Sequence, residues 1–267
     1  MRLALALAAG LALATPLAAQ EIVTVSAREG ATQSFFVANM GGVKPEAAAL
    51  LFTGGGGNIR LRMEEGQVRF GAGNFLPRSR AEFIRNGILP VIMDVPSDQN
   101  TAGGMGDDFR MGAAHLADVR AAVAEVKKRF PGLPVFLVGT SRGTVSIAYL
   151  ARRMAPDEVK GGVLTSSLFR SGTGARAAPM LGAFDWSEAK VPLLFVHHRE
   201  DACGATPYAS AASLAARFPL VSVKGGKPPE SGPCDPYHAH GFWGAEAPTV
   251  DAIAAWMLGK PFQKEIE

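Results

Sequence analysis

This sequence lacks the features that mark several large classes of protein. Its 27 basic and 24 acidic side chains leave a net charge of only +3, and no lysine- or arginine-rich run is present. That balance gives no electrostatic basis for a nucleic-acid partner or a polybasic membrane surface. The phosphate-loop ending Gly-Lys-Ser/Thr and the dinucleotide fingerprint are missing, and no cofactor signature is found. Without a linker, repeat or low-complexity tract, residues 20–267 are expected to form one domain.

Long apolar stretches are also scarce, and the one that stands out lies at the start of the chain. A positive charge at Arg2 precedes apolar residues 3–14, and small residues follow at Ala18 and Ala19. The apolar run is shorter than the roughly 20 residues that cross a bilayer. This pattern favours a secretory signal peptide over a membrane anchor. We expect residues 1–19 to be removed and the mature protein to be soluble, either in the periplasm or secreted.

Cysteine occurs only twice, at Cys203 and Cys234. In the oxidising compartment that an exported protein reaches, such a pair is expected to form a disulfide. Closing a loop of this length stabilises a protein by ~3–4 kcal/mol on chain-entropy grounds. A zinc site that adds His238 and His240 to the two cysteines is the alternative. The long spacing and the oxidising compartment disfavour it, so no metal is expected.

The chain does contain a regular alternation of short apolar runs and amphipathic segments after an opening hairpin. This order indicates an α/β fold with a mostly parallel sheet and helices on both faces. In the clearest helix, 113–130, apolar residues recur at three- and four-residue steps. The expected strands are 21–27, 34–40, 47–52, 88–95, 135–139, 159–165, 191–196 and 220–223, and the expected helices are 79–86, 113–130, 142–154, 206–218 and 249–258.

The pattern Gly139-x-Ser141-x-Gly143 lies between an apolar strand and a helix. In a chain with 31 glycines this five-residue pattern can occur by chance, so alone it is weak evidence for a nucleophile. Its position between a strand and a helix strengthens that evidence. A sharp strand-to-helix turn requires glycine on either side and lifts the serine hydroxyl out of the sheet. A helix N-cap is the structural alternative for this serine. The preceding strand favours the nucleophile.

A serine hydroxyl needs a neighbouring base to take its proton, and the base needs an acid to orient it. Asp201 follows the strand 191–196 and is the expected acid, with Glu200 as the alternative. His240 lies in the loop before the last helix and is the expected base, with His238 as the alternative. Of the remaining histidines, His115 is expected to be structural. His197 and His198 end a strand, and one of them is expected to pack inside and the other to be solvated.

The order Ser141, Asp201, His240 is that of the α/β-hydrolase superfamily, which the mature chain resembles from the opening hairpin to the last helix. The matching features are the serine elbow, the acid after a late strand and the histidine before the final helix. Gly241-Phe242 after His240 is similar to the family's histidine loop, which favours His240 over His238. The resemblance implies a Ser-His-Asp triad that acts through an acyl-enzyme without a cofactor.

Acyl transfer also needs backbone N–H groups that stabilise an oxyanion. The amide of Arg142 and the loop after strand 47–52, at Gly54 or Gly55, are the expected donors. Thr53 stands where lipase-type His-Gly-Gly-Gly sequences have histidine, so the chain departs from that subgroup. A flexible turn is the alternative interpretation of the glycines.

Cys203 follows Asp201 by two residues, and Cys234 precedes His240 by six. If both catalytic assignments hold, the disulfide connects the acid loop to the base loop. It is therefore expected to fix the geometry of the Asp–His pair.

The stretch 167–190 is the usual place for a lid in this superfamily. It contains scattered glycine and alanine and one bulky cluster, Phe184-Asp185-Trp186, so little or no cap is expected. An open site suits small-molecule or polymer-attached esters, and a carboxylic ester hydrolase is the expected function. A peptidase or amidase with the same triad, and a non-catalytic binding protein of the same fold, are the alternatives.

Overall fold

A computed structural model of the chain describes residues 20–171 and 180–267. The expected signal peptide, residues 1–19, lies outside the described residues, as do residues 172–179 of the expected lid region. Within the described ranges, no helix is both long and apolar enough to cross a membrane.

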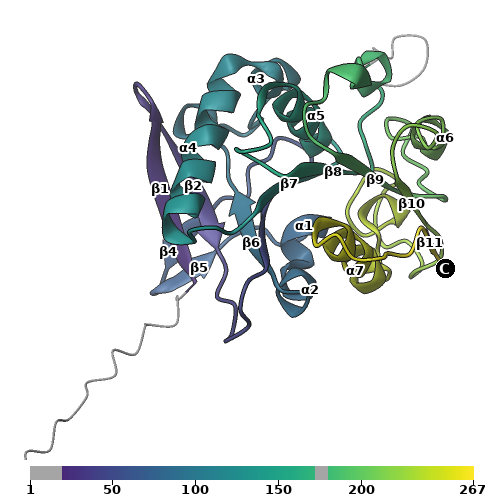
Figure 1. Ribbon diagram of the computed structural model, residues 1–267, viewed down its shortest axis with the longest axis horizontal. Helices are drawn as coiled ribbons and strands as arrows, with labels where there is room; N and C mark the ends of the chain where they lie inside the picture. The colour runs from purple at the N-terminus through teal and green to yellow at the C-terminus, as the bar shows by residue number, and fades with distance from the viewer. Residues whose placement is uncertain (1–19, 172–179) are drawn as a thin grey trace, which may run out of the picture.

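A nine-stranded sheet forms the centre of the molecule, with the strand order β1-β2-β6-β3-β7-β8-β9-β10-β11 (Figure 1). The first three strands in this order pair antiparallel, and all later neighbours pair parallel. This confirms the expected mostly parallel sheet with an N-terminal hairpin. The strands are β1 (Glu21–Arg28), β2 (Ala31–Val37), β3 (Ala47–Phe52), β6 (Ile88–Met93), β7 (Val135–Thr140), β8 (Gly161–Thr165), β9 (Leu193–His198), β10 (Leu220–Val223) and β11 (Glu265–Ile266), and a separate hairpin holds β4 (Arg62–Glu64) and β5 (Gln67–Arg69).

The central strands are buried along their whole length because helices cover both faces of the sheet. Every residue of β3, β6, β7, β8 and β9 is buried, which is why these strands read as continuous apolar runs. Helices α3, α4 and α5 lie on one face, and α1, α2 and α7 lie on the other (Figure 1). The helices are α1 (Phe75–Arg78), α2 (Arg80–Arg85), α3 (Asp107–Met111), α4 (Ala113–Arg129), α5 (Gly143–Arg153), α6 (Tyr208–Ala212) and α7 (Glu246–Met257).

The segment 206–218 is a regular helix only over α6, which corrects the expectation of a longer one. Beyond α6 the backbone continues in turns, with Leu214 N donating to Ala211 O at 3.0 Å. The Ser213 hydroxyl donates to Ser210 O at 2.8 Å, and such a local side-chain bond competes with helical pairing.

The bulky cluster of the expected lid region does not cover anything on the surface. Phe184 and Trp186 are buried, and the Trp186 ring packs edge-on against Phe195 of β9 at 5.0 Å between centroids. The described part of 167–190 contains only two short 3₁₀ turns, Leu181–Ala183 and Trp186–Glu188. Its aromatic side chains therefore extend the core of the α5 face.

Candidate active site

Ser141 lies on a tight turn between β7 and α5, with Thr140 ending the strand and Gly143 beginning the helix. Its φ of 52° is in the left-handed region, which is costly for a residue with a side chain. Hydrogen bonds hold the turn in place: Ser141 N donates to Thr165 O at 2.9 Å, and the Thr144 hydroxyl donates to Ser141 O at 2.6 Å. The structure thus maintains a strained backbone at the position that the sequence marks as the nucleophile.

The two glycines of the pattern are required by close approach of the backbone on both sides of the turn. A Cβ at Gly143 would lie 2.2 Å from Phe52 O, and one at Gly139 would lie 2.6 Å from Gly143 O. Neither has a positive φ. The glycines therefore allow β3, β7 and α5 to meet closely beneath the serine.

Asp201 and His240 form a buried pair next to this turn. His240 lies in the 3₁₀ turn Ala239–Gly241 before α7, and its Nδ1 is 3.0 Å from Asp201 Oδ2. The two side chains are 5% and 0% exposed, respectively, so solvent competes little for this contact. Asp201 also accepts from Cys203 N at 2.9 Å and from the Thr206 hydroxyl at 2.7 Å. A carboxylate only accepts, so Nδ1 of His240 is the donor and Nε2 remains for a proton from elsewhere.

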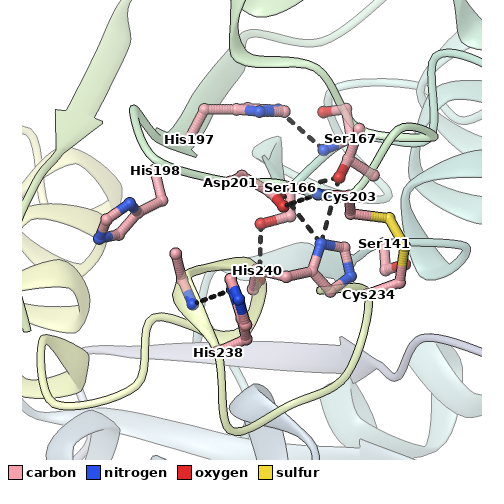
Figure 2. A network of polar contacts seen from close by, with 12 residues as sticks. Ser141, Ser166, Ser167, His197, His198, Asp201, Cys203, Cys234, His238 and His240 are labelled. Carbon is pink, nitrogen blue, oxygen red and sulfur yellow. Dashed lines mark hydrogen bonds and ion pairs between the residues drawn. A yellow bond between two sulfur atoms is a disulfide. The ribbon is translucent and has the colours of Figure 1, made fainter. Parts of the chain in front are cut away.

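Ser141 and His240 line the same cavity, which has a volume of about 240 Å³. Figure 2 shows the edge of the His240 ring opposite the Asp201 contact turned toward Ser141. Within the described residues, no hydrogen bond joins the Ser141 hydroxyl to this ring. Such contacts commonly tighten only once substrate is bound. The structure therefore brings together the three residues expected to form a triad.

The alternative acid and base occupy other positions. Glu200 is exposed, and it is its backbone N–H that bonds to His198 Nδ1, at 3.1 Å. His238 caps the following 3₁₀ turn, where its Nδ1 accepts from Ala239 N at 2.9 Å. Neither side chain is among those that line the cavity.

His197 and His198 are both buried, which corrects the expectation that one of them is solvated. The Nε2 of His197 accepts from Ser167 N at 2.8 Å, and burial lowers the pKa of His197 to about 3. His198 bonds to Gly225 O at 3.0 Å, and burial lowers its pKa as well. Both rings are therefore neutral, and they pack at the C-terminal end of β9, directly before the loop that carries Asp201.

The glycine loop that follows β3, residues 53–58, lies next to Ser141. Gly54 and Gly55 line the cavity, and a Cβ at Gly54 would lie 3.0 Å from Ser141 Cβ. The Arg142 side chain is turned to Asp107, with 2.9 Å between Nε and Oδ1. Its backbone N–H, at the start of α5, is thus the part of Arg142 relevant to an oxyanion. Of the three expected donors, Gly54 and Gly55 line the cavity, and Arg142 directly follows Ser141, which lines it too.

A buried arginine that the sequence did not single out supports this loop from below. Arg110 of α3 is 1% exposed, and it donates to Gly55 O at 3.1 Å and to the Ser146 hydroxyl of α5 at 3.0 Å. Burial lowers the pKa of Arg110 to about 10, so the side chain remains charged at neutral pH. Arg110 thereby connects the glycine loop to the helix that follows the nucleophile.

A second arginine holds the histidine loop. Arg78 of α1 donates to Gly241 O at 2.8 Å and to Pro236 O at 3.2 Å, on either side of His240. Its guanidinium also pairs with Glu246 at 3.0 Å and lies over the Trp243 ring. No local sequence pattern indicates this role, because its partners are 158 to 168 residues away along the chain.

The expected disulfide between Cys203 and Cys234 is present and closes a separation of 31 residues. It joins the loop that carries Asp201 to the loop that carries His240, and Cys234 lines the cavity (Figure 2). Because both sulfur atoms are bonded to each other, neither is a thiolate that could bind zinc. Among the residues that the structure describes, no group of histidine, cysteine and carboxylate side chains has the arrangement of a metal site.

A protein-family model matches more than half of the chain. The family model described as serine aminopeptidase, S33, matches residues 81–224, a region that includes Ser141 and Asp201. A search of curated proteins finds no match.

Similar solved structures include three hydrolases. The esterase Pf2001 of Pyrococcus furiosus is 12% identical, with 90% of this chain and 91% of that chain covered and a TM-score of 0.54. The esterase domain of a Rhodothermus marinus protein is 17% identical, with 91% and 99% covered and a TM-score of 0.55. A soluble variant of monoglyceride lipase from Saccharomyces cerevisiae is 12% identical, with 94% and 97% covered and a TM-score of 0.58. At these identities the likeness concerns the fold.

Proposed function

Because the chain belongs to the serine aminopeptidase S33 family of α/β-hydrolases, we propose that it is a serine hydrolase that cleaves carboxylic esters through an acyl-enzyme at Ser141. The observation that carries this proposal is the buried contact of 3.0 Å between His240 and Asp201 beside the strained turn of Ser141. An aspartate that fixes the Nδ1–H tautomer leaves the other ring nitrogen free to act as a base.

In this mechanism the Ser141 hydroxyl attacks the ester carbonyl while His240 Nε2 takes its proton. Asp201 stabilises the resulting imidazolium through the contact with Nδ1. The carbonyl oxygen becomes negative and accepts from the amides of Arg142 and of Gly54 or Gly55. His240 then gives its proton to the leaving alcohol. In the second half of the reaction, water attacks the acyl-enzyme while His240 takes a proton from it, and His240 returns that proton to Ser141 as the carboxylic acid leaves.

The size of the cavity favours a small acyl group. A volume of about 240 Å³ lies below the ~300–1,000 Å³ of pockets that enclose drug-sized ligands. A small-molecule ester, or an ester group attached to a polymer, fits such a site because only the reacting group has to enter it.

An aminopeptidase is the second candidate, because the description of the family names that activity. A free amino terminus on the substrate calls for a nearby carboxylate, and Asp235 lines the cavity. Rates on a leucine anilide and on short aryl esters therefore discriminate between the two substrate classes.

Labelling with a fluorophosphonate probe tests the nucleophile directly. We expect the wild type to be labelled, and Ser141→Ala to be unlabelled at an unchanged melting temperature. His240→Ala and Asp201→Asn should lower kcat on p-nitrophenyl acetate by roughly 10³-fold or more. Their matched controls, His238→Ala and Glu200→Gln, should retain wild-type rates.

Two outcomes decide against the proposal. A correctly folded wild type that neither reacts with the probe nor turns over any ester or anilide would indicate a non-catalytic binding protein. Loss of activity in His238→Ala instead of His240→Ala would move the base to the other histidine.

A further inference from the structure

Asn74 occupies the N-cap position of α1 without capping that helix. Asparagine is among the residues that favour this position most, since its side chain can accept from the first free N–H groups. Here the side chain makes no hydrogen bond to α1. Its Oδ1 is buried without a hydrogen-bond partner in the described part of the chain.

Asn74 instead lines the cavity that Ser141 and His240 also line. The point where a Cβ of Gly54 would stand lies 3.4 Å from Asn74 Nδ2 and 3.0 Å from Ser141 Cβ. The amide nitrogen and the nucleophile therefore flank the same glycine, whose backbone N–H is an expected oxyanion donor.

This placement costs stability in two ways. The asparagine gives up the stabilisation of a helix cap, and a buried polar oxygen without a partner is itself unfavourable. The unpartnered oxygen can only accept, so the group available to a substrate oxygen is the N–H₂ at the other end of the carboxamide, which lies near Gly54, supplies two donors and carries no net charge. A neutral donor suits a site in which negative charge appears only as the reaction proceeds.

We propose that Asn74 is a further catalytic residue, whose side-chain N–H₂ donates a hydrogen bond to the carbonyl oxygen of the substrate as that oxygen becomes the oxyanion. It acts beside the backbone amides of Gly54 and Arg142. This inference rests on the proposed function, because it concerns the same acyl transfer at Ser141.

The variant Asn74→Asp separates a catalytic role from a helix-capping role. Aspartate caps helices about as well as asparagine, and its charge is favourable at a helix N-terminus. A capping role thus predicts that Asn74→Asp keeps both stability and activity. A role as oxyanion donor predicts that Asn74→Asp folds normally and loses activity, since a carboxylate has no N–H and repels the oxyanion.

The measurement is steady-state hydrolysis of p-nitrophenyl acetate together with inhibition by an aryl trifluoromethyl ketone, which forms a tetrahedral adduct with serine. We expect Asn74→Ala to lower kcat by roughly 10²-fold and Asn74→Asp by at least as much, with KM nearly unchanged. The inhibition constant for the ketone should rise in parallel with the loss of kcat/KM.

Asn39→Asp is the charge-matched control and should behave as wild type. Asn39 follows β2, and the neighbouring Ala38 N donates to Pro90 O near the start of β6. Asn39 thus lies at the end of the sheet opposite the cavity. Melting temperatures of all variants identify any failure to fold, and Asn74→Ala decides the question if Asn74→Asp is unstable.

The inference is overturned if both Asn74 variants hydrolyse ester at wild-type kcat, or if only KM rises. An inactive wild type would instead refute the proposed function, so the two failures are distinguishable.

Discussion

Two serines at the ends of neighbouring strands have left-handed backbone conformations, Ser141 after β7 with φ of 52° and Ser166 after β8 with φ of 45°. Each such residue costs of order 1–3 kcal/mol and persists only where surrounding contacts fix it. The Ser166 hydroxyl donates to the backbone oxygen of His240 at 2.8 Å. One strained residue thus carries the proposed nucleophile, and the other anchors the proposed base.

Thr206 provides a test of how firmly the acid must be held. Thr206→Val keeps the shape of the side chain but removes the hydroxyl that donates to Asp201 at 2.7 Å. A hydrogen bond to a charged group contributes ~1.5–3 kcal/mol, so we expect kcat on p-nitrophenyl acetate to fall by roughly 10- to 100-fold. Thr206→Ser, which retains the hydroxyl, should preserve most of the rate. Wild-type kcat in Thr206→Val would show that the other contacts of Asp201 suffice.

The sequence could indicate Ser141, Asp201 and His240 because each lies at a recognisable place in the order of strands and helices. In the structure Ser141 and His240 line one cavity and Asp201 contacts His240 from behind, while their catalytic roles remain predictions. Asn74 and Arg110 could not be found in this way. Asn74 lies next to Gly54, and Arg110 bonds to Gly55, only in the folded chain, and no local sequence pattern indicates either contact.

At the scale of elements, the disulfide joins two loops that would otherwise move independently. Cys203 follows Asp201 closely enough that its own N–H donates to that carboxylate, and Cys234 lines the cavity. The bridge is therefore coupled to the geometry of the acid and base as well as to stability.

Removal of the bridge should lower activity more than it disturbs the fold. For the double variant Cys203→Ala/Cys234→Ala we expect a loss of ~3–4 kcal/mol in unfolding free energy, with folded protein still predominant at 25 °C. Under those conditions kcat should fall by roughly tenfold or more, since the Asp–His geometry is no longer fixed. Circular dichroism, denaturant unfolding and ester hydrolysis, repeated on the wild type in dithiothreitol, measure both effects. Parallel loss of structure and activity would reduce the disulfide to a stabilising cross-link.

The central strands were predictable because burial on both faces leaves an unbroken apolar run. Strands β3 and β10 have the bounds expected from the sequence. The hairpin of β4 and β5 was not expected, because most of its residues are exposed and carry no apolar alternation. Helices α1 and α3 were also missed, since four and five residues are too few to show a helical period.

Three buried histidines with a lowered pKa, His115, His197 and His198, make the stability of the molecule depend on pH, and for the first two the lowered value is about 3. Burial lowers the pKa of both His115 and His197 to about 3, whereas an unfolded chain binds these protons near pH 6.5. Between these values the unfolded state binds more protons, so the unfolding free energy falls as pH falls. The stabilisation is complete above pH 6.5 and decreases by ~1.4 kcal/mol per pH unit for each histidine below it.

His115→Leu removes the contribution of one of these histidines. Neither ring nitrogen of His115 has a hydrogen-bond partner among the described residues, and the ring packs against Phe52 and Phe109. Leucine should therefore be accommodated. Denaturant unfolding between pH 4.5 and 7.5 is expected to show a shallower dependence of the unfolding free energy on pH than in the wild type. An unchanged slope would mean that groups other than His115 take up the protons.

The burial of Arg110 has a consequence for how the protein responds to its surroundings. Its guanidinium lies under the glycine loop, where Gly55 O accepts from it, and no ion pair to it is found among the described residues. Dissolved ions screen charges in solvent within about 8–10 Å at ordinary salt but reach a buried charge poorly. Salt therefore screens the charge of Arg110 less than it screens the exposed charges of the surface. We therefore expect the electrostatic contribution of Arg110 to the glycine loop to change little with salt concentration.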